Sequence, residues 1–144
     1  MGLTITKPEI IECMKTGEHS STFSGNPLAC AAGYATLEAL TEDKLVENAD
    51  KTGRYFKDSL LMLKERHRII REVRGLGMML ALELRFDVKD ILLSAIQKGL
   101  LMLYSGRNII RLLPPLVMDE RTVSRAIHIM DLVLSEEEKR RHVV

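Results

Sequence analysis

The sequence is poor in aromatic residues and has almost no net charge. It contains no tryptophan, three tyrosines and three phenylalanines in 144 residues, and its formal net charge at pH 7 is +1. A surface that binds nucleic acid needs aromatic platforms or a strong positive field, and an anionic membrane also attracts positive charge. The composition therefore argues against nucleic acid and against a membrane surface as partners.

Long hydrophobic runs and a signal-peptide pattern are also absent, so we expect a cytoplasmic protein without a membrane span. The two cysteines, Cys13 and Cys30, have neither CxxC spacing nor a histidine pattern suited to zinc. Two free thiols are typical of a reducing compartment. Cys30 lies among alanines in a predicted helix, where we expect it to be buried. No metal site is expected.

The most informative segment runs from Gly17 to Gly33 and reads GEHSSTFSGNPLACAAG. Four hydroxyls (Ser20, Ser21, Thr22 and Ser24) and a flexible glycine precede Asn-Pro, which is typical of an N-cap and the first helical residue. Hydroxyls beside a helix N-terminus are suited to a phosphate. The same residues also occur in ordinary loops and helix caps, so local chemistry leaves both interpretations open.

Three segments together resemble a known family. HSSTFSGNPLACAAG, EVRGLGMMLALEL and NIIRLLPPLVMDE resemble, in this order, motifs of the class III, fold type I pyridoxal-phosphate aminotransferases. This group holds the 4-aminobutyrate, ornithine, acetylornithine and acetyllysine aminotransferases. The resemblance covers nearly the whole chain, and it departs from the family pattern at Ser24, where the family has a glycine.

The resemblance implies a reaction that moves an amino group from an amino acid to a 2-oxo acid, with pyridoxal phosphate as the cofactor. It favours slightly a 4-aminobutyrate aminotransferase. It also implies that the Schiff-base lysine belongs to a large N-terminal domain outside the matched part. Lys7 and Lys15 do not stand in the family's lysine context, so we assign no catalytic residue here. The chain by itself is expected to be inactive and to bind the cofactor weakly or not at all.

Arg111 is the first candidate for a binding role. A guanidinium matches a carboxylate with two parallel donors, and the resemblance implies that this arginine binds the substrate carboxylate. The alternative is a surface ion pair of ordinary kind. The resemblance further implies that Thr22, assisted by Ser21, reaches the cofactor phosphate of a partner subunit.

Other residues stand out less. His19 is interpreted as a capping or packing residue, with a proton carrier as the alternative. Arg74, Gly75 and Gly77 are expected to shape a turn beside the site, and Glu83 on an apolar strand needs a partner that sequence does not name. No role is given to the three remaining histidines, which are His67, His128 and His142.

Hydrophobic periodicity predicts helices over residues 7–15 and 27–40, a longer helix opened by residues 41–43, and helices over 88–99 and after Asp119. Strands are predicted over residues 68–74, 78–84, 100–104 and 108–113. The run Glu136–His142 is predicted to be a solvated helix end.

These elements predict an α+β fold: a small, mostly antiparallel sheet packed with helices. The resemblance makes residues 1–40 the tail of the large domain and connecting helix, and 41–144 the C-terminal small domain.

Three functions stay open at this point. The chain is part of a transaminase that needs a separate large-domain chain, or it is a non-catalytic truncated remnant that self-associates as a homo-oligomer. The third is a regulatory module that binds small carboxylates or phosphates. The remnant is expected to expose the apolar surface that once faced the large domain, and such a surface favours self-association.

Overall fold

The computed structural model describes residues 2, 4–15, 17–18 and 21–142, in two compact units. The first unit ends at Lys44 and contains two helices, α1 (Pro8–Ile11) and α2 (Pro27–Glu42). The predicted Asn26 cap is confirmed, because its side chain accepts a hydrogen bond from the Ala29 amide at 2.9 Å. Helix α1 is much shorter than the predicted helix over residues 7–15.

Two further predictions about the first unit are wrong. Residues 41–43 do not open a helix: α2 continues through Glu42, and the Thr41 hydroxyl donates to the Leu37 carbonyl at 2.9 Å, as in a helix interior. Lys44, at φ 50°, then breaks the helical path. Cys30 is exposed rather than buried, because none of the residues of α2 is buried in this small unit.

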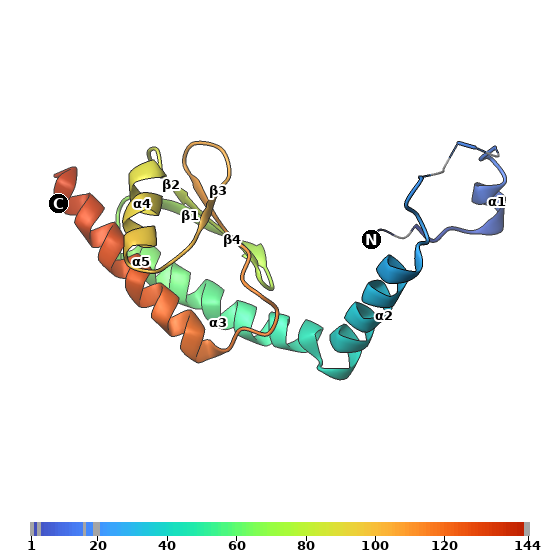
Figure 1. Cartoon of the computed structure of the whole chain (residues 1–144). Helices are drawn as coiled ribbons and strands as arrows, with labels where there is room; N and C mark the ends of the chain where they lie inside the picture. The colour runs from blue at the N-terminus through green and yellow to red at the C-terminus, as the bar shows by residue number, and fades with distance from the viewer. Residues whose placement is uncertain (1, 3, 16, 19–20, 143–144) are drawn as a thin grey trace. The chain divides into compact units, whose positions relative to one another are not determined.

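The second unit, from Leu45 onward, is a four-stranded antiparallel sheet with helices on one face (Figure 1). The strand order is β1-β2-β4-β3, which confirms the predicted α+β class. Its elements in chain order are α3 (Leu45–Arg66), β1 (Ile70–Leu76), β2 (Met79–Leu84), α4 (Lys89–Gln97), β3 (Leu103–Tyr104), β4 (Ile109–Leu112) and α5 (Glu120–Arg140).

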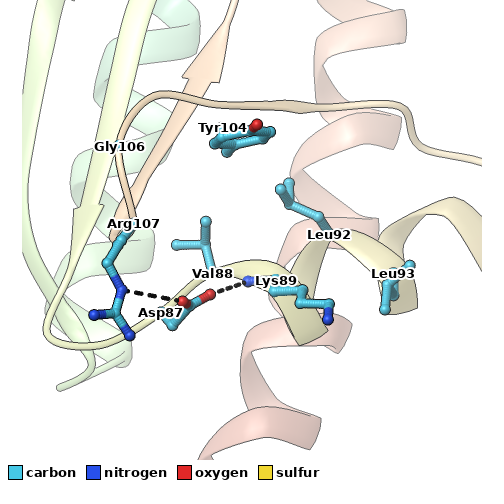
Figure 2. Close-up of a pocket in the computed structure, with 8 residues that line it drawn as sticks. All are labelled: Asp87, Val88, Lys89, Leu92, Leu93, Tyr104, Gly106 and Arg107. Atoms are coloured by element: carbon cyan, nitrogen blue, oxygen red, sulfur yellow. Dashed lines mark hydrogen bonds and ion pairs between the residues drawn. The ribbon is translucent and has the colours of Figure 1, made fainter.

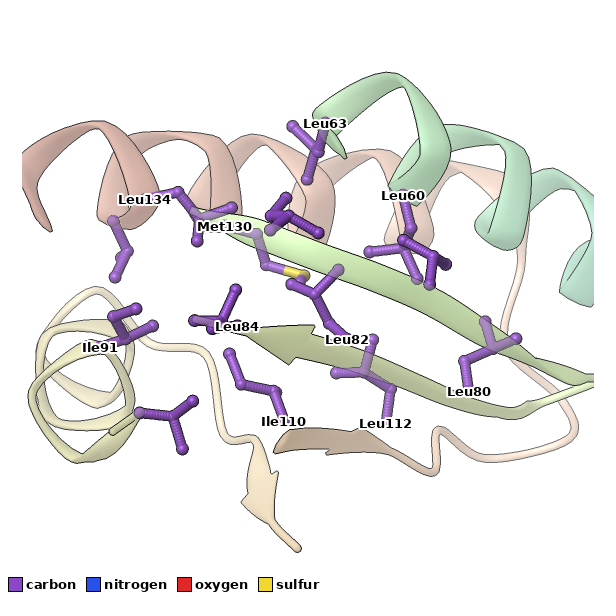
Figure 3. Close-up of a cluster of buried hydrophobic side chains, with 14 of the residues drawn as sticks. Leu60, Leu63, Leu80, Leu82, Leu84, Ile91, Ile110, Leu112, Met130 and Leu134 are labelled. Carbon is purple, nitrogen blue, oxygen red and sulfur yellow. The ribbon is translucent and has the colours of Figure 1, made fainter. Parts of the chain in front are cut away.

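The core lies between the sheet and its helices (Figure 3). Leu80, Leu82 and Leu84 alternate along β2 and point toward the helices, where Leu60 of α3 and Met130 of α5 cover them. Because side chains alternate between the faces of a strand, the residues between these leucines lie on the opposite, outer face of the sheet. Within the described part of this unit, no helix lies on that outer face (Figure 1).

A bulge in β1 changes which of its side chains face the core and which face outward. Ile70 pairs with Leu84, but Glu72 pairs with Glu83, so that β1 has one extra residue between the two pairs. A bulge of this kind lets residues three apart share a face. Ile70 and Val73 are therefore both buried, while Arg71 and Glu72 are both exposed.

The helix end that was predicted to be solvated is partly buried. Glu137 is only 5% exposed and accepts hydrogen bonds from Arg140 and Arg141. Glu138 bonds to His67 at 2.9 Å. The last turns of α5 thus pack on the unit through their carboxylates, because compact pairing with arginine and histidine offsets the cost of burying charge.

No helix within the described ranges is long and apolar enough to cross a membrane.

Candidate functional site

Arg111 lies on the outer face of the sheet. Its neighbours along β4, Ile110 and Leu112, point into the core, so alternation turns Arg111 outward. Its Cα partners are Ala81 on β2 and Leu103 on β3. The Arg111 guanidinium makes no hydrogen bond or ion pair with any residue that the structure describes, and the side chain is exposed.

A hollow of about 550 Å³ opens beside Arg111. The tip of the β1–β2 hairpin forms one wall of this hollow, through Leu76 and Met79, and Ser105 contributes to another. Arg74 lines the hollow as well. Apolar walls with a few cationic side chains are suited to a small carboxylate that carries an apolar chain.

The hairpin tip depends on glycines, as predicted. Gly75 and Gly77 have φ values of +136° and +53°, which favour glycine. A Cβ on Gly53 of α3 would lie 2.7 Å from the Cα of Gly77 and closer still to its carbonyl. The absence of a side chain at Gly53 therefore allows α3 to support the wall of the hollow.

Glu83 finds its partners on the same outer face. Its two carboxylate oxygens accept hydrogen bonds from Arg74 at 2.7 Å and from Arg71 at 3.1 Å. Arg74 also pairs with Glu72 at 3.0 Å. The hydrogen bond from Arg74 lowers the pKa of the Glu83 carboxyl, against the effect of burial, and the same bond raises the pKa of Arg74. Both groups are therefore charged at neutral pH.

A second hollow, of about 420 Å³, lies between α4 and the loop before β4 (Figure 2). Its walls include Leu92, Leu93 and Tyr104. Arg107 points toward Asp87, with 3.5 Å between Nε and the carboxylate. The arginine of this hollow thus already faces a carboxylate, whereas Arg111 faces none among the described residues.

The other predicted site residues lie in the first unit. Ser21 and Thr22 belong to a turn in which the Ser24 hydroxyl donates to the Ser21 carbonyl at 2.9 Å. Gly25, at φ +68°, leads from this turn to the cap of α2. His19 lies outside the described residues. The described residues hold no cluster of His, Cys, Asp and Glu side chains suited to a metal ion.

Sequence reasoning gave no role to His67, which the structure places in a carboxylate cluster. The ring is buried, with Asp131 at 2.7 Å from Nε2 and Glu138 at 2.9 Å from Nδ1. Its partners are 64 and 71 positions away in the sequence, so no local sequence pattern predicts the cluster. The contacts join the end of α3 to α5, which indicates a structural role.

Comparison with known proteins decides the family. The model of the family described as "Aminotransferase class-III" matches residues 1–134. The chain belongs to the class III aminotransferases. It is 45% identical, over 123 residues, to the acetylornithine aminotransferase of Caldanaerobacter subterraneus subsp. tengcongensis, covering 85% of this chain and 31% of that protein.

Solved structures agree with this family. The acetylornithine aminotransferase of Elizabethkingia anophelis is 36% identical with a TM-score of 0.81, over 88% of this chain and 34% of that one. The ornithine aminotransferase of Toxoplasma gondii is 30% identical with a TM-score of 0.85, over 93% of this chain and 32% of that one. Its structure has pyridoxal phosphate at partial occupancy in the active site. This class III aminotransferase chain thus spans about a third of the length of its relatives. Class III relatives depend on pyridoxal phosphate.

Proposed function

We propose that this chain is the C-terminal part of an acetylornithine- or ornithine-type aminotransferase, in which Arg111 binds the carboxylate of the amino donor and of the 2-oxo acid. The observation that carries this proposal is the exposed guanidinium of Arg111, which has no partner among the described residues and lies beside a hollow of about 550 Å³. The names of the relatives support acetylornithine or ornithine as donor, rather than the 4-aminobutyrate that the sequence motifs favour slightly.

We assign the cofactor phosphate to Ser21 and Thr22. The donor set fits a phosphate, because two hydroxyls stand before the N-terminus of α2 and residues 21–26 contain no acidic side chain. In this proposal Thr22 serves the cofactor of a partner subunit. The partner is then a second copy of the whole protein or a separate large-domain chain, and residues 1–40 belong with that large domain.

The cofactor, this chain and the large domain have different roles in the proposed reaction. Pyridoxal phosphate, when bound, acts as an electron sink for the carbon that bears the amino group. Residues of this chain bind and orient the substrate and the cofactor. Arg111 holds the substrate carboxylate through its two parallel donors, and the hydroxyls of Ser21 and Thr22 donate hydrogen bonds to the cofactor phosphate. Proton transfer is the task of a lysine that the family resemblance assigns to the large domain.

Complementation tests the proposal. The purified chain is mixed with the part of the Caldanaerobacter relative that precedes the segment matched here, and amino transfer from acetylornithine or ornithine to a 2-oxo acid is measured. We expect activity in the mixture with the wild-type chain and its loss with Arg111→Gln. Arg107→Gln, a change at an arginine that is 90% exposed, is the control and should retain activity. A folded chain that never restores activity would contradict the proposal.

A second experiment tests whether the chain alone is inactive. Pyridoxal phosphate is titrated into the purified chain, the absorbance is followed, and borohydride reduction and mass spectrometry locate any modified lysine. We expect no stoichiometric adduct. An adduct on a single lysine, with a spectrum that changes when an amino donor is added, would show that the chain holds a catalytic lysine.

The self-associating remnant remains a second candidate because large apolar side chains are exposed on this chain. Leu76 is 84% exposed, Leu101 83% and Val117 70%. Such side chains favour association. Sedimentation of the chain alone measures this: a stable homo-oligomer that excludes the complementing chain supports the remnant, whereas a monomer that binds the complementing chain supports the transaminase.

A further inference from the structure

The strands of the sheet carry five charged side chains, and all of them lie on the outer face. They are Arg71, Glu72, Arg74, Glu83 and Arg111. Three guanidiniums therefore face two carboxylates, which leaves one positive charge in excess. One guanidinium of this face therefore has no carboxylate of the sheet to pair with, and it is suited to one carboxylate of a ligand.

The contacts between these side chains show which arginine is left without a carboxylate partner. Glu83 is well placed to hold two guanidiniums, because its side chain is 14% exposed and each of its oxygens accepts from a different arginine. Arg74 Nη1 is shared between Glu83 at 2.7 Å and Glu72 at 3.0 Å. Arg111 is the only strand arginine without such a partner among the residues that the structure describes.

Register explains why Arg74 matters to Arg111. Arg74 pairs with Ala81, and Ala81 pairs on its other side with Arg111. The two arginines thus flank one small residue on the same face, with backbones about 10 Å apart at two strand spacings. Both side chains line the same hollow. A released Arg74 would be within reach of the far end of a ligand bound at Arg111.

We propose that Glu83 is a specificity-determining residue: by holding Arg71 and Arg74 it leaves Arg111 as the single guanidinium free for a carboxylate, so that the hollow accepts ligands with one carboxylate as readily as ligands with two. The inference rests on the proposed function of Arg111. Glu83 does not touch the ligand in this proposal. It acts through Arg74, and its loss adds a second anion site instead of removing the first.

The test is an NMR titration of the full 144-residue chain with butyrate and with glutarate, which differ by one carboxylate. The Nε–Hε signals of Arg111, Arg74 and Arg107 report binding at each arginine. In the wild type we expect both ligands to shift Arg111 only, with similar affinity. In Glu83→Gln we expect glutarate to shift Arg74 as well, and the preference for glutarate over butyrate to rise about threefold, as for one added exposed ion pair.

Further variants separate this role from a structural one. The double variant Glu83→Gln with Arg74→Gln should return the preference to the wild-type value. Glu72→Gln is the matched control: Glu72 also bonds Arg74 but is 53% exposed, and its loss leaves Glu83 with both arginines, so the preference should not change. If Glu83→Gln does not fold, Glu83→Asp keeps the charge but shortens the side chain by one methylene, and it should show a smaller rise.

The outcomes distinguish the two proposals. If Arg111 does not respond to either ligand in the wild type, the proposed carboxylate-binding function of Arg111 is wrong. If Arg111 responds but neither variant of Glu83 changes the preference or the Arg74 signal, the function of Arg111 stands and the role of Glu83 is wrong. A shift of Arg107 equal to that of Arg111 would show unspecific binding and overturn both.

Discussion

His67 and Asp131 lie 64 positions apart in the sequence and are joined by a 2.7 Å contact between Nε2 and Oδ1. Arg66 reaches the other oxygen of the same carboxylate at 3.0 Å. The end of α3 is thereby fixed to the middle of α5. Since β1 follows α3 after a short turn, this contact also sets where the sheet begins.

We therefore expect Asp131→Ala to destabilise the chain. The change leaves the buried His67 ring with one unpaired nitrogen, which costs about 2 kcal/mol of unfolding free energy. Urea denaturation followed by circular dichroism measures it. Asp50→Ala is the control, because Asp50 forms an exposed pair with Arg54 within one helix, and such pairs contribute less than about 1 kcal/mol. Equal losses in the two variants would contradict the structural role of Asp131.

The stabilising effect of Asp131 should depend on pH. Burial by itself raises the pKa of the Asp131 carboxyl, but the hydrogen bond from His67 and the charge of Arg66 outweigh it and bring the pKa below the ordinary value of 3.8. A lowered folded pKa stabilises the protein above the unfolded value and loses that effect as pH falls through the folded value.

The difference in unfolding free energy between the wild type and Asp131→Ala should thus be constant from pH 7 to 5 and shrink below about pH 4. Urea denaturation at pH 7, 5 and 3 measures it. A difference that grows as the pH falls would show that the carboxylate is not held in its charged form.

Gly53→Ala should destabilise the chain although it lies within a helix. Alanine normally favours a helix over glycine by about 1 kcal/mol. Here the added methyl would meet the backbone of Gly77 at the hairpin tip, so the hairpin must shift. A lower melting temperature and altered amide shifts around Gly75 are expected. Asp58→Ala, at an exposed position of the same helix, should not lower the melting temperature.

The two faces of the hairpin should respond differently to the same substitution. Leu82 is 0% exposed and packs in the core, so Leu82→Ala should lower the unfolding free energy by about 3 kcal/mol. Leu76 is 84% exposed, and Leu76→Ala should change it by less than about 0.5 kcal/mol. Urea denaturation compares them. A large loss in Leu76→Ala would mean that the outer face is covered, as in a self-associated chain.

Local signals in the sequence predicted most of the elements. The cap residues Asn26 and Asp119 begin helices where expected, with their side chains accepting from amides three residues on. The pair of short strands before Pro114 is also confirmed as an antiparallel hairpin. These features depend on backbone chemistry within a few residues, which the sequence displays directly.

The errors have two causes. Residues 41–43 offered good capping groups, yet α2 runs through Glu42, because a cap residue competes with the helix that precedes it. The charged run from Glu136 has the composition of a solvated helix end, yet Glu137 is buried by arginines and Glu138 by its bond to His67. The partners of Glu137 lie within the same helix end, whereas Glu138 depends on a partner 71 positions away in the chain.

In the candidate site, too, some features follow from the sequence alone and others only from the folded chain. The sequence by itself determined the family, through its motifs, and named Arg111 as the candidate for binding a carboxylate. Only the tertiary structure decided that Arg71 and Arg74 are held by Glu83 while Arg111 is left without a partner among the described residues. The reason is that pairing between charges depends on strand order, register and the bulge in β1, and these arise only when distant segments form one sheet.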